Sequence, residues 1–330
     1  MTETILPTGA PQPMARSSTL RGQLLFAAKI TVTLGVLALL LSQADWVRLS
    51  ERISHASPWL LALGFAIKAM TIPFAAERWR MIGKSVGVRL SAGLSLRLMM
   101  VSLFFGQVLP GALGGDLVRG WLTWRSGQPP TAVATALLLD RLAALAGVVI
   151  LMLAGLPHLL TVIPWSLAAI VLVMAGMVAV GLTALVLIDR APWVAGLTHP
   201  MAIHLRALSS NLRGALTHRG ALEALGHSVA VHLCTIAATL VFAAALSVPV
   251  HPLDALAIMP FTITAMALPV SLAGWGVREG SMVAGFALFG MVGEDALLIS
   301  LLIGVSVTLM ALPGGLVWLI LSREGTLRAP

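Results

Sequence analysis

Apolar runs long enough to cross a lipid bilayer recur along the whole of this chain. They cover about 24–41, 58–76, 132–153, 164–188, 227–246 and 296–321. A helix needs about 20 mostly apolar residues to span a hydrocarbon layer of about 30 Å. Of the 330 residues, 58% are hydrophobic and 10% are charged, whereas about 25% of residues are charged in a soluble domain. The sequence therefore predicts an all-α polytopic membrane protein with about six full spans.

The predicted organisation is a single integral membrane domain over 21–322, flanked by cytoplasmic tails at 1–20 and 323–330. The first tail is rich in Pro, Ser and Thr and lacks apolar periodicity, so we expect it to be flexible. The run after it is also compatible with a signal peptide, because Ser42-Gln43-Ala44 resembles a cleavage site. Its length and the presence of Lys29 favour an uncleaved first span.

The distribution of basic residues predicts the orientation in the membrane. The segments 77–97 and 189–225, the stretch after Gly115 and both tails hold most of the Arg and Lys residues. Basic loops stay in the cytoplasm, so both termini should lie on that side of the inner (cytoplasmic) membrane. We interpret the net charge of +8 as topology signal and as contact with anionic lipid headgroups, not with nucleic acid.

Residues 197–216 have a different pattern, with leucines and a methionine at steps of three or four. Arg206 and Arg213 are seven residues apart and share another face. This spacing predicts an amphipathic helix lying on the cytoplasmic interface. It is either a plain connector or a gate or docking element.

The most informative feature is an internal repeat. Segment 109–119 aligns without gaps on 268–278, with Leu, Pro, Leu, Gly, Val and Arg matching at six of eleven positions. The offset is 268 − 109 = 159 residues. Three predicted spans lie between the copies, and an odd number of crossings reverses direction. The copies should therefore enter the membrane from opposite faces, within repeat halves at about 58–154 and 226–321.

Each copy contains Pro and Gly, which interrupt a helix. Backbone breaks at membrane depth survive only inside protein or beside a wet cavity, and paired broken helices in inverted repeats mark the central site of many transporters. We expect two broken helices, either re-entrant or fully crossing. The alternative is a pair of helix caps, each with an arginine that reaches a headgroup interface.

Arg119 and Arg278, which end the two copies, are the predicted ligands of a phosphate or other anionic headgroup. Asp116 and Trp275 mark the start of the second half of each broken helix, where the helix dipole favours an anion. The remaining candidate residues at the breaks are Gly115 and Gly274.

Asp140 and Arg141 form a charged pair inside the span 132–153, and Glu279 directly follows Arg278. Ionisable groups at that depth face a partner or a cavity. Lys68, near the middle of another span, should meet an internal acid. The candidate pairings are Asp140 with Arg119 or Arg278, and Arg141 with Asp116 or Glu279.

No catalytic constellation, cofactor motif or metal-ligand spacing is present in the sequence. It has one cysteine and eight histidines, which are scattered. We therefore expect no enzyme activity, no cofactor and no metal.

Four motifs in order resemble those of a known family: FGQVLPGALGGDLVR at 105–119, LDRL at 139–142, LAGWGVREG at 272–280 and LPGG at 312–315, with ERW at 77–79. This pattern is similar to the lysylphosphatidylglycerol synthase transmembrane region, also called the flippase-like or UPF0104 family. The resemblance covers most of 20–322. It implies a bacterial or archaeal membrane protein associated with moving lipids between leaflets. The synthase domain is not expected here, because the chain ends nine residues after Leu321.

The resulting hypothesis is a lipid translocase for an anionic or phosphate-bearing lipid, driven downhill or by an ion gradient. In it, Asp116 and Glu279 orient the arginines or gate the site, and the Asp140/Arg141 pair links the two halves. Two alternatives stay open. One is a non-transporting accessory protein that serves a lipid-modifying enzyme or glycosyltransferase, and the other is an intramembrane transferase acting on polyprenyl-phosphate lipids.

Overall fold

The computed structural model describes residues 20–42, 45–109, 114–166, 219–267 and 271–323, with scattered positions between 167 and 218. Every long element in these ranges is a helix, and no strand occurs among them. This confirms the predicted all-α class. The helices are α1 (Leu20–Ser42), α2 (Trp46–Ser54), α3 (Pro58–Ala69), α4 (Thr71–Ser85), α5 (Ala92–Val108), α6 (Gly114–Arg125), α7 (Pro130–Leu159), the short η1 (Ile188–Arg190), α11 (Arg219–Ala245), α12 (Pro252–Ala267), α13 (Val277–Ala287) and α14 (Gly293–Arg323).

Four helical stretches in the described ranges are long and apolar enough to cross a membrane. They are Pro58–Ser85, Pro130–Leu159, Gly220–Ala245 and Gly293–Arg323. They correspond to four of the six predicted spans, and α1 covers the first predicted run. The predicted span at 164–188 is described only at scattered positions, and the predicted interfacial helix at 197–216 lies mostly outside the described residues.

The helix that contains the second predicted span continues beyond the end of that span. Helices α3 and α4 follow one another across Met70, whose backbone is itself helical, and α4 continues to Ser85. The predicted membrane segment ends near 76, because the charged stretch that follows is typical of a loop. The helix continues because Glu77 and Arg80 pair on its surface while Arg78 and Trp79 turn into the protein.

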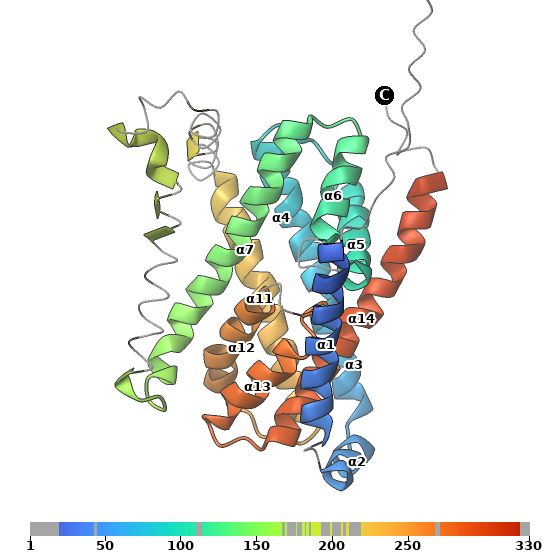
Figure 1. Cartoon of the computed structure of the whole chain (residues 1–330), viewed down its shortest axis with the longest axis vertical. Coiled ribbons are helices and arrows are strands. Elements are labelled where there is room, and N and C mark those ends of the chain that lie inside the picture. The colour runs from blue at the N-terminus through green and yellow to red at the C-terminus, as the bar shows by residue number, and fades with distance from the viewer. Residues whose placement is uncertain are drawn as a thin grey trace, which may run out of the picture.

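Two pairs of short helices enter the bundle from opposite ends. The pair α5–α6 occupies the upper half of Figure 1 and the pair α12–α13 the lower half. Helix α6 has 12 residues, about 18 Å at 1.5 Å per residue, so it is too short to cross alone. Helix α13 has 11 residues and is also too short, while α5 packs against α6 and α12 against α13. Each broken segment therefore folds as a hairpin within the bundle, which the sequence left undecided.

The offset of 159 residues relates the helices as well as the motif. It carries α5 onto 251–267, where α12 spans Pro252–Ala267, and α7 onto 289–318, where α14 spans Gly293–Arg323. The stretch 58–85 falls on 217–244, against α11. Helices α7 and α14 run in opposite directions in Figure 1. The inverted relation expected from the motif therefore holds along each half.

The two halves exchange their packing partners. Helix α5 packs along α14, α12 packs along α7, and α4 packs along α11. Each short helix thus lies against the long helix of the other half. Two apolar cores result, one around Phe242, Phe286 and Ile299 towards the α2 end, the other around Trp79 and Leu122 towards the opposite end.

Two equivalent glycines allow these crossings. A Cβ on Gly314 of α14 would lie 2.1 Å from the carbonyl oxygen of Met100 in α5, and a Cβ on Gly155 of α7 would lie 2.5 Å from that of Leu256 in α12. Their numbers differ by 314 − 155 = 159. Backbone lies against backbone at both sites, so neither neighbour can move aside easily.

Changing Gly314 or Gly155 to alanine should therefore destabilise the protein, by about 1–3 kcal/mol or more, as overpacking does. The matched control is Gly226→Ala in α11, where an added Cβ meets nothing within 4 Å. That change should be neutral or stabilising, because alanine favours helix. Thermal unfolding in detergent measures both, and equal effects at the two kinds of position would contradict the close crossings.

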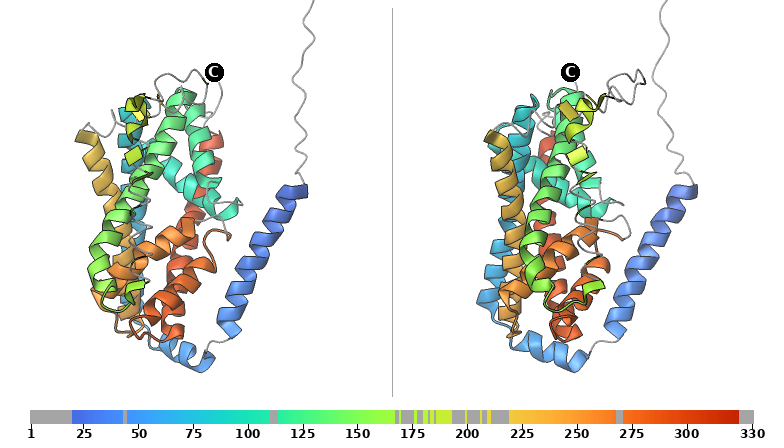
Figure 2. Two further views of the ribbon diagram at one scale, coloured as in Figure 1. Left: turned by 60° about the vertical axis from the view of Figure 1, so that its left-hand side comes forward. Right: turned by 90° about the vertical axis from the view of Figure 1, so that its left-hand side faces the viewer.

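The first two helices attach to the rest at the same end. Helix α2 lies across the lower end in Figure 1, and α1 runs beside the bundle in both views of Figure 2. Arg52 of α2 binds both carboxylate oxygens of Asp295, at 3.1 and 3.2 Å. Helix α1 contacts α13, and its Thr33 hydroxyl accepts a hydrogen bond from the backbone N–H of Leu272 at 3.1 Å.

Candidate functional site: two buried arginine clusters

Asp140 is the centre of the first cluster. It lies on α7 about ten residues from the helix start, and it is 2% exposed. Its Oδ1 accepts a hydrogen bond from Nε of Arg78 at 2.7 Å, and its Oδ2 accepts one from Nη2 of Arg119 at 2.8 Å. One carboxylate therefore compensates two guanidinium groups inside the protein.

Arg119 is held from several sides. Its guanidinium stacks over the ring of Trp79 at 4.2 Å, and its Nη2 also donates to Asp116 at 3.0 Å. Asp116 in turn pairs with Arg141. Three arginines and two aspartates give this cluster a formal charge of +1. Of the alternatives left open by the sequence, the structure contains Asp140 with Arg119 and Arg141 with Asp116.

The first cluster reaches the second half of the protein through Arg78. Its Nη1 donates to the hydroxyl of Ser228 on α11 at 3.4 Å. We expect the Asp140/Arg141 pair to link the halves; Arg78, which binds Asp140, carries a hydrogen bond from this cluster to the second half.

The second cluster lies at the start of α13. Arg278 donates from Nε to Oε1 of Glu279 at 3.0 Å and to the hydroxyl of Ser300 at 3.3 Å. Its guanidinium stacks over the Trp275 ring at 4.4 Å. Gly304 of α14 provides the space, because a Cβ there would lie 2.1 Å from Nη2 of Arg278. Both aligned arginines thus stack on a tryptophan and pair with a carboxylate.

Glu279 also caps the helix. Its Oε2 accepts a hydrogen bond from the backbone N–H of Gly276 at 2.6 Å, as in a capping box. Gly274 and Gly276 have φ of 80° and 83°, a left-handed conformation that favours glycine. The break before α13 therefore depends on these glycines and on the carboxylate of Glu279.

The nine predicted site residues fall into two separate groups. Asp140 pairs with Arg119 in the first group, and Glu279 pairs with Arg278 in the second. Gly115 lies at the start of α6, where a Cβ would meet the carbonyl oxygen of Ser102 at 2.1 Å, so it permits the α5–α6 contact. Arg119 and Arg278 are 1% and 2% exposed, while the Arg141 side chain is 44% exposed.

Several residues of these clusters were not expected. Arg78 and Trp79 belong to a stretch assigned to a cytoplasmic loop, although Arg78 precedes Ile82 by four residues and so continues the buried face of α4. Lys68 was expected to meet an acid. Its described partner is instead the Thr235 hydroxyl, at 2.8 Å. A hydroxyl partner is invisible to a search for opposite charges.

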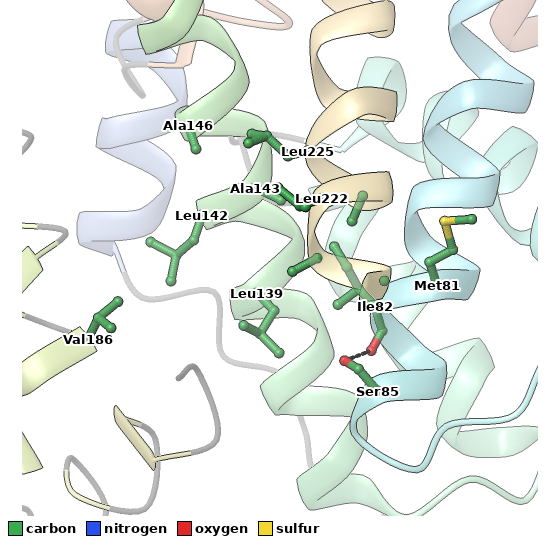
Figure 3. Close-up of a pocket in the computed structure, with 13 residues that line it drawn as sticks. Met81, Ile82, Ser85, Leu139, Leu142, Ala143, Ala146, Val186, Leu222 and Leu225 are labelled. Atoms are coloured by element: carbon green, nitrogen blue, oxygen red, sulfur yellow. Dashed lines mark hydrogen bonds between the residues drawn. The ribbon is translucent and has the colours of Figure 1, made fainter. Parts of the chain in front are cut away.

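An apolar cavity of about 240 Å³ lies among α4, α7 and α11. Figure 3 shows Ile82, Leu139 and Leu225 among the side chains that line it. Ile82 follows Arg78 by one helical turn, and Leu139 directly precedes Asp140. An apolar space of this kind is suited to part of a hydrocarbon chain. Along α4 it begins about one helical turn from the first cluster.

These features define a polytopic helical membrane protein made of two inverted halves, each with a hairpin and a buried arginine. Residues 26–315 match the family described as lysylphosphatidylglycerol synthase TM region, and the chain belongs to that family. It is also similar to a UPF0104 membrane protein of Methanothermobacter thermautotrophicus, 33% identical over 70 residues. That match covers 21% of this chain and 20% of the relative. No solved structure matches the chain.

Proposed function

We propose that the protein moves a lipid with an anionic or phosphate-bearing headgroup between the leaflets of the cytoplasmic membrane. The observation that carries the proposal is the pair of inverted hairpins, each with a buried arginine near its break. In inverted-repeat transporters, broken helices meet at a central site and the halves rock around it. The family name points to the same chemical class, because phosphatidylglycerol lipids carry a phosphate.

In this mechanism the headgroup first meets Arg141, whose side chain is the most exposed of the first cluster. The phosphate then replaces Asp116 as a partner of Arg119, and the cavity beside α7 accepts apolar parts of the lipid. Arg278 performs the equivalent role from the other side. Guanidinium groups suit this exchange because they bind carboxylate and phosphate in the same bidentate geometry.

We place the end that carries the last turns of α4, α6 and α14 in the cytoplasm, with both termini. These turns contain Lys84, Arg125 and Arg323. The first turns of α12 and α14 at the other end contain acids. This asymmetry agrees with the positive-inside rule.

The test is leaflet exchange of fluorescent phosphatidylglycerol and of a fluorescent polyprenyl phosphate in proteoliposomes. Arg119→Lys and Arg278→Lys keep the charge but lose the bidentate fork and the planar stacking. We expect each to slow exchange at least tenfold, whereas Arg80→Ala, which breaks only a surface pair on α4, should leave the rate unchanged. Thermal unfolding of each variant confirms that it is folded.

The outcomes also separate the alternatives. If folded wild-type protein moves neither lipid, with or without a proton gradient, the translocase proposal fails and an accessory role is favoured. Release of a chemically modified lipid by the purified protein would instead indicate an intramembrane transferase.

A further inference from the structure

Three potential metal ligands meet at the α2 end of the molecule, away from both arginine clusters. His158 lies in the last turn of α7, His251 directly precedes α12, and Asp254 lies in the first turn of α12. One ligand atom of each lies within 4.8 Å of the other two. Nε2 of His158 and Oδ1 of Asp254 are already 2.7 Å apart.

The fold holds these side chains in place. His251 and Asp254 are three residues apart across a turn in which the backbone N–H of Asp254 donates to the carbonyl of His251 at 3.0 Å. The ring of His158 stacks parallel to that of Phe289, with centroids 5.1 Å apart and an angle of 4°. Gly155, one turn before His158, brings α7 against the backbone of α12.

Two imidazoles and one carboxylate are a ligand set that zinc accepts, with a further position open to water. At zinc–ligand distances of about 2.0–2.2 Å, neighbouring ligand atoms in a tetrahedral site lie about 3.3 Å apart. The three ligand atoms lie within 4.8 Å of one another, and His251 is exposed, so its ring can turn inward at little energetic cost. Nδ1 of His251 accepts a hydrogen bond from the backbone N–H of Leu253 at 3.3 Å, and the ring centroids of His251 and His158 are 5.9 Å apart.

We propose that His158, His251 and Asp254 form a site for a transition-metal dication of the zinc class. The ion joins α7 of the first half to α12 of the second half. The equivalent positions at the other end, one repeat offset away, are Val317, Ala92 and Ser95, none of which supplies an imidazole or a carboxylate. The proposed metal site is therefore present at one of the two repeat-related positions and not at the other.

The test is titration of the full-length, untagged protein in detergent with zinc chloride, using competition with a chromophoric chelator and thermal unfolding. Zinc should bind at one equivalent and raise the unfolding temperature, because a ligand that binds only the folded state stabilises it. Magnesium should have no effect at the same concentration, because it prefers an octahedral shell of oxygen ligands. His158→Ala and His251→Ala should each weaken zinc binding at least about tenfold, because each removes a direct ligand. Even a change in residues that only support the ligands typically costs about 10–100-fold in metal affinity.

Two variants make the result specific. His55→Ala removes an exposed imidazole from the same end of the molecule and should leave zinc binding unchanged. Asp254→Asn retains a hydrogen-bonding partner for His158 but removes the charged ligand, so it should weaken zinc binding while the metal-free unfolding temperature changes little. The proposal is overturned if wild-type protein binds no more zinc than the His158→Ala/His251→Ala double variant, or if His55→Ala loses as much affinity as His251→Ala.

Discussion

Replacing Asp140 by alanine should lower the free energy of unfolding by about 3–5 kcal/mol, the effect of removing one partner from a buried ion pair. Asp140 is 2% exposed and accepts hydrogen bonds from both Arg78 and Arg119. Without it, two guanidinium groups remain buried with little compensation. Thermal unfolding in detergent measures the effect, and Glu223→Ala on the exposed face of α11 is the control.

A triple variant separates the charge effect from packing. Arg78→Met, Arg119→Met and Asp140→Leu together remove the charges and keep most of the side-chain volume. Replacing a buried ionic group by apolar residues is often neutral or stabilising, so this protein should recover most of the lost stability while losing lipid movement. If Asp140→Ala is no more harmful than Glu223→Ala, the buried network does not exist as described.

Glu279→Ala should have an effect of similar size, about 3–5 kcal/mol, because it leaves Arg278 buried without its carboxylate. Glu279 is fully buried, and it also accepts the backbone N–H of Gly276 at the start of α13. Losing this cap adds a contribution of about 1 kcal/mol. Unfolding experiments on the purified full chain measure the sum.

Glu279→Gln divides these two roles. Glutamine still offers an oxygen to Gly276 but removes the negative charge from beside Arg278. We expect it to be less destabilising than Glu279→Ala, by an amount near the capping contribution. Equal losses in the two variants would mean that Glu279 acts only as the counter-ion of Arg278, and wild-type stability in both would contradict the described site.

The membrane class, most of the spans and both helix breaks could be predicted from the sequence. The reason is local: hydrocarbon forces each spanning segment to satisfy its own backbone hydrogen bonds, so apolar length and Pro/Gly breaks are visible in short windows. The same reasoning failed at 77–85, where a charged stretch resembles a loop. There Arg78 and Trp79 are buried by contacts with α6, α7 and α11, which no local window contains.

The repeat offset is a property of the sequence, and it predicts two broken helices that enter from opposite faces. The partner of each buried charge was decided only by tertiary packing. Asp140 had two candidate arginines; the position of α6 selected Arg119, and the position of α4 added Arg78. His158 and Asp254 are 96 residues apart in the chain and have no metal-ligand spacing. They meet because Gly155 lets α7 approach α12, and a contact of that kind depends on how two helices cross rather than on any pattern within either one.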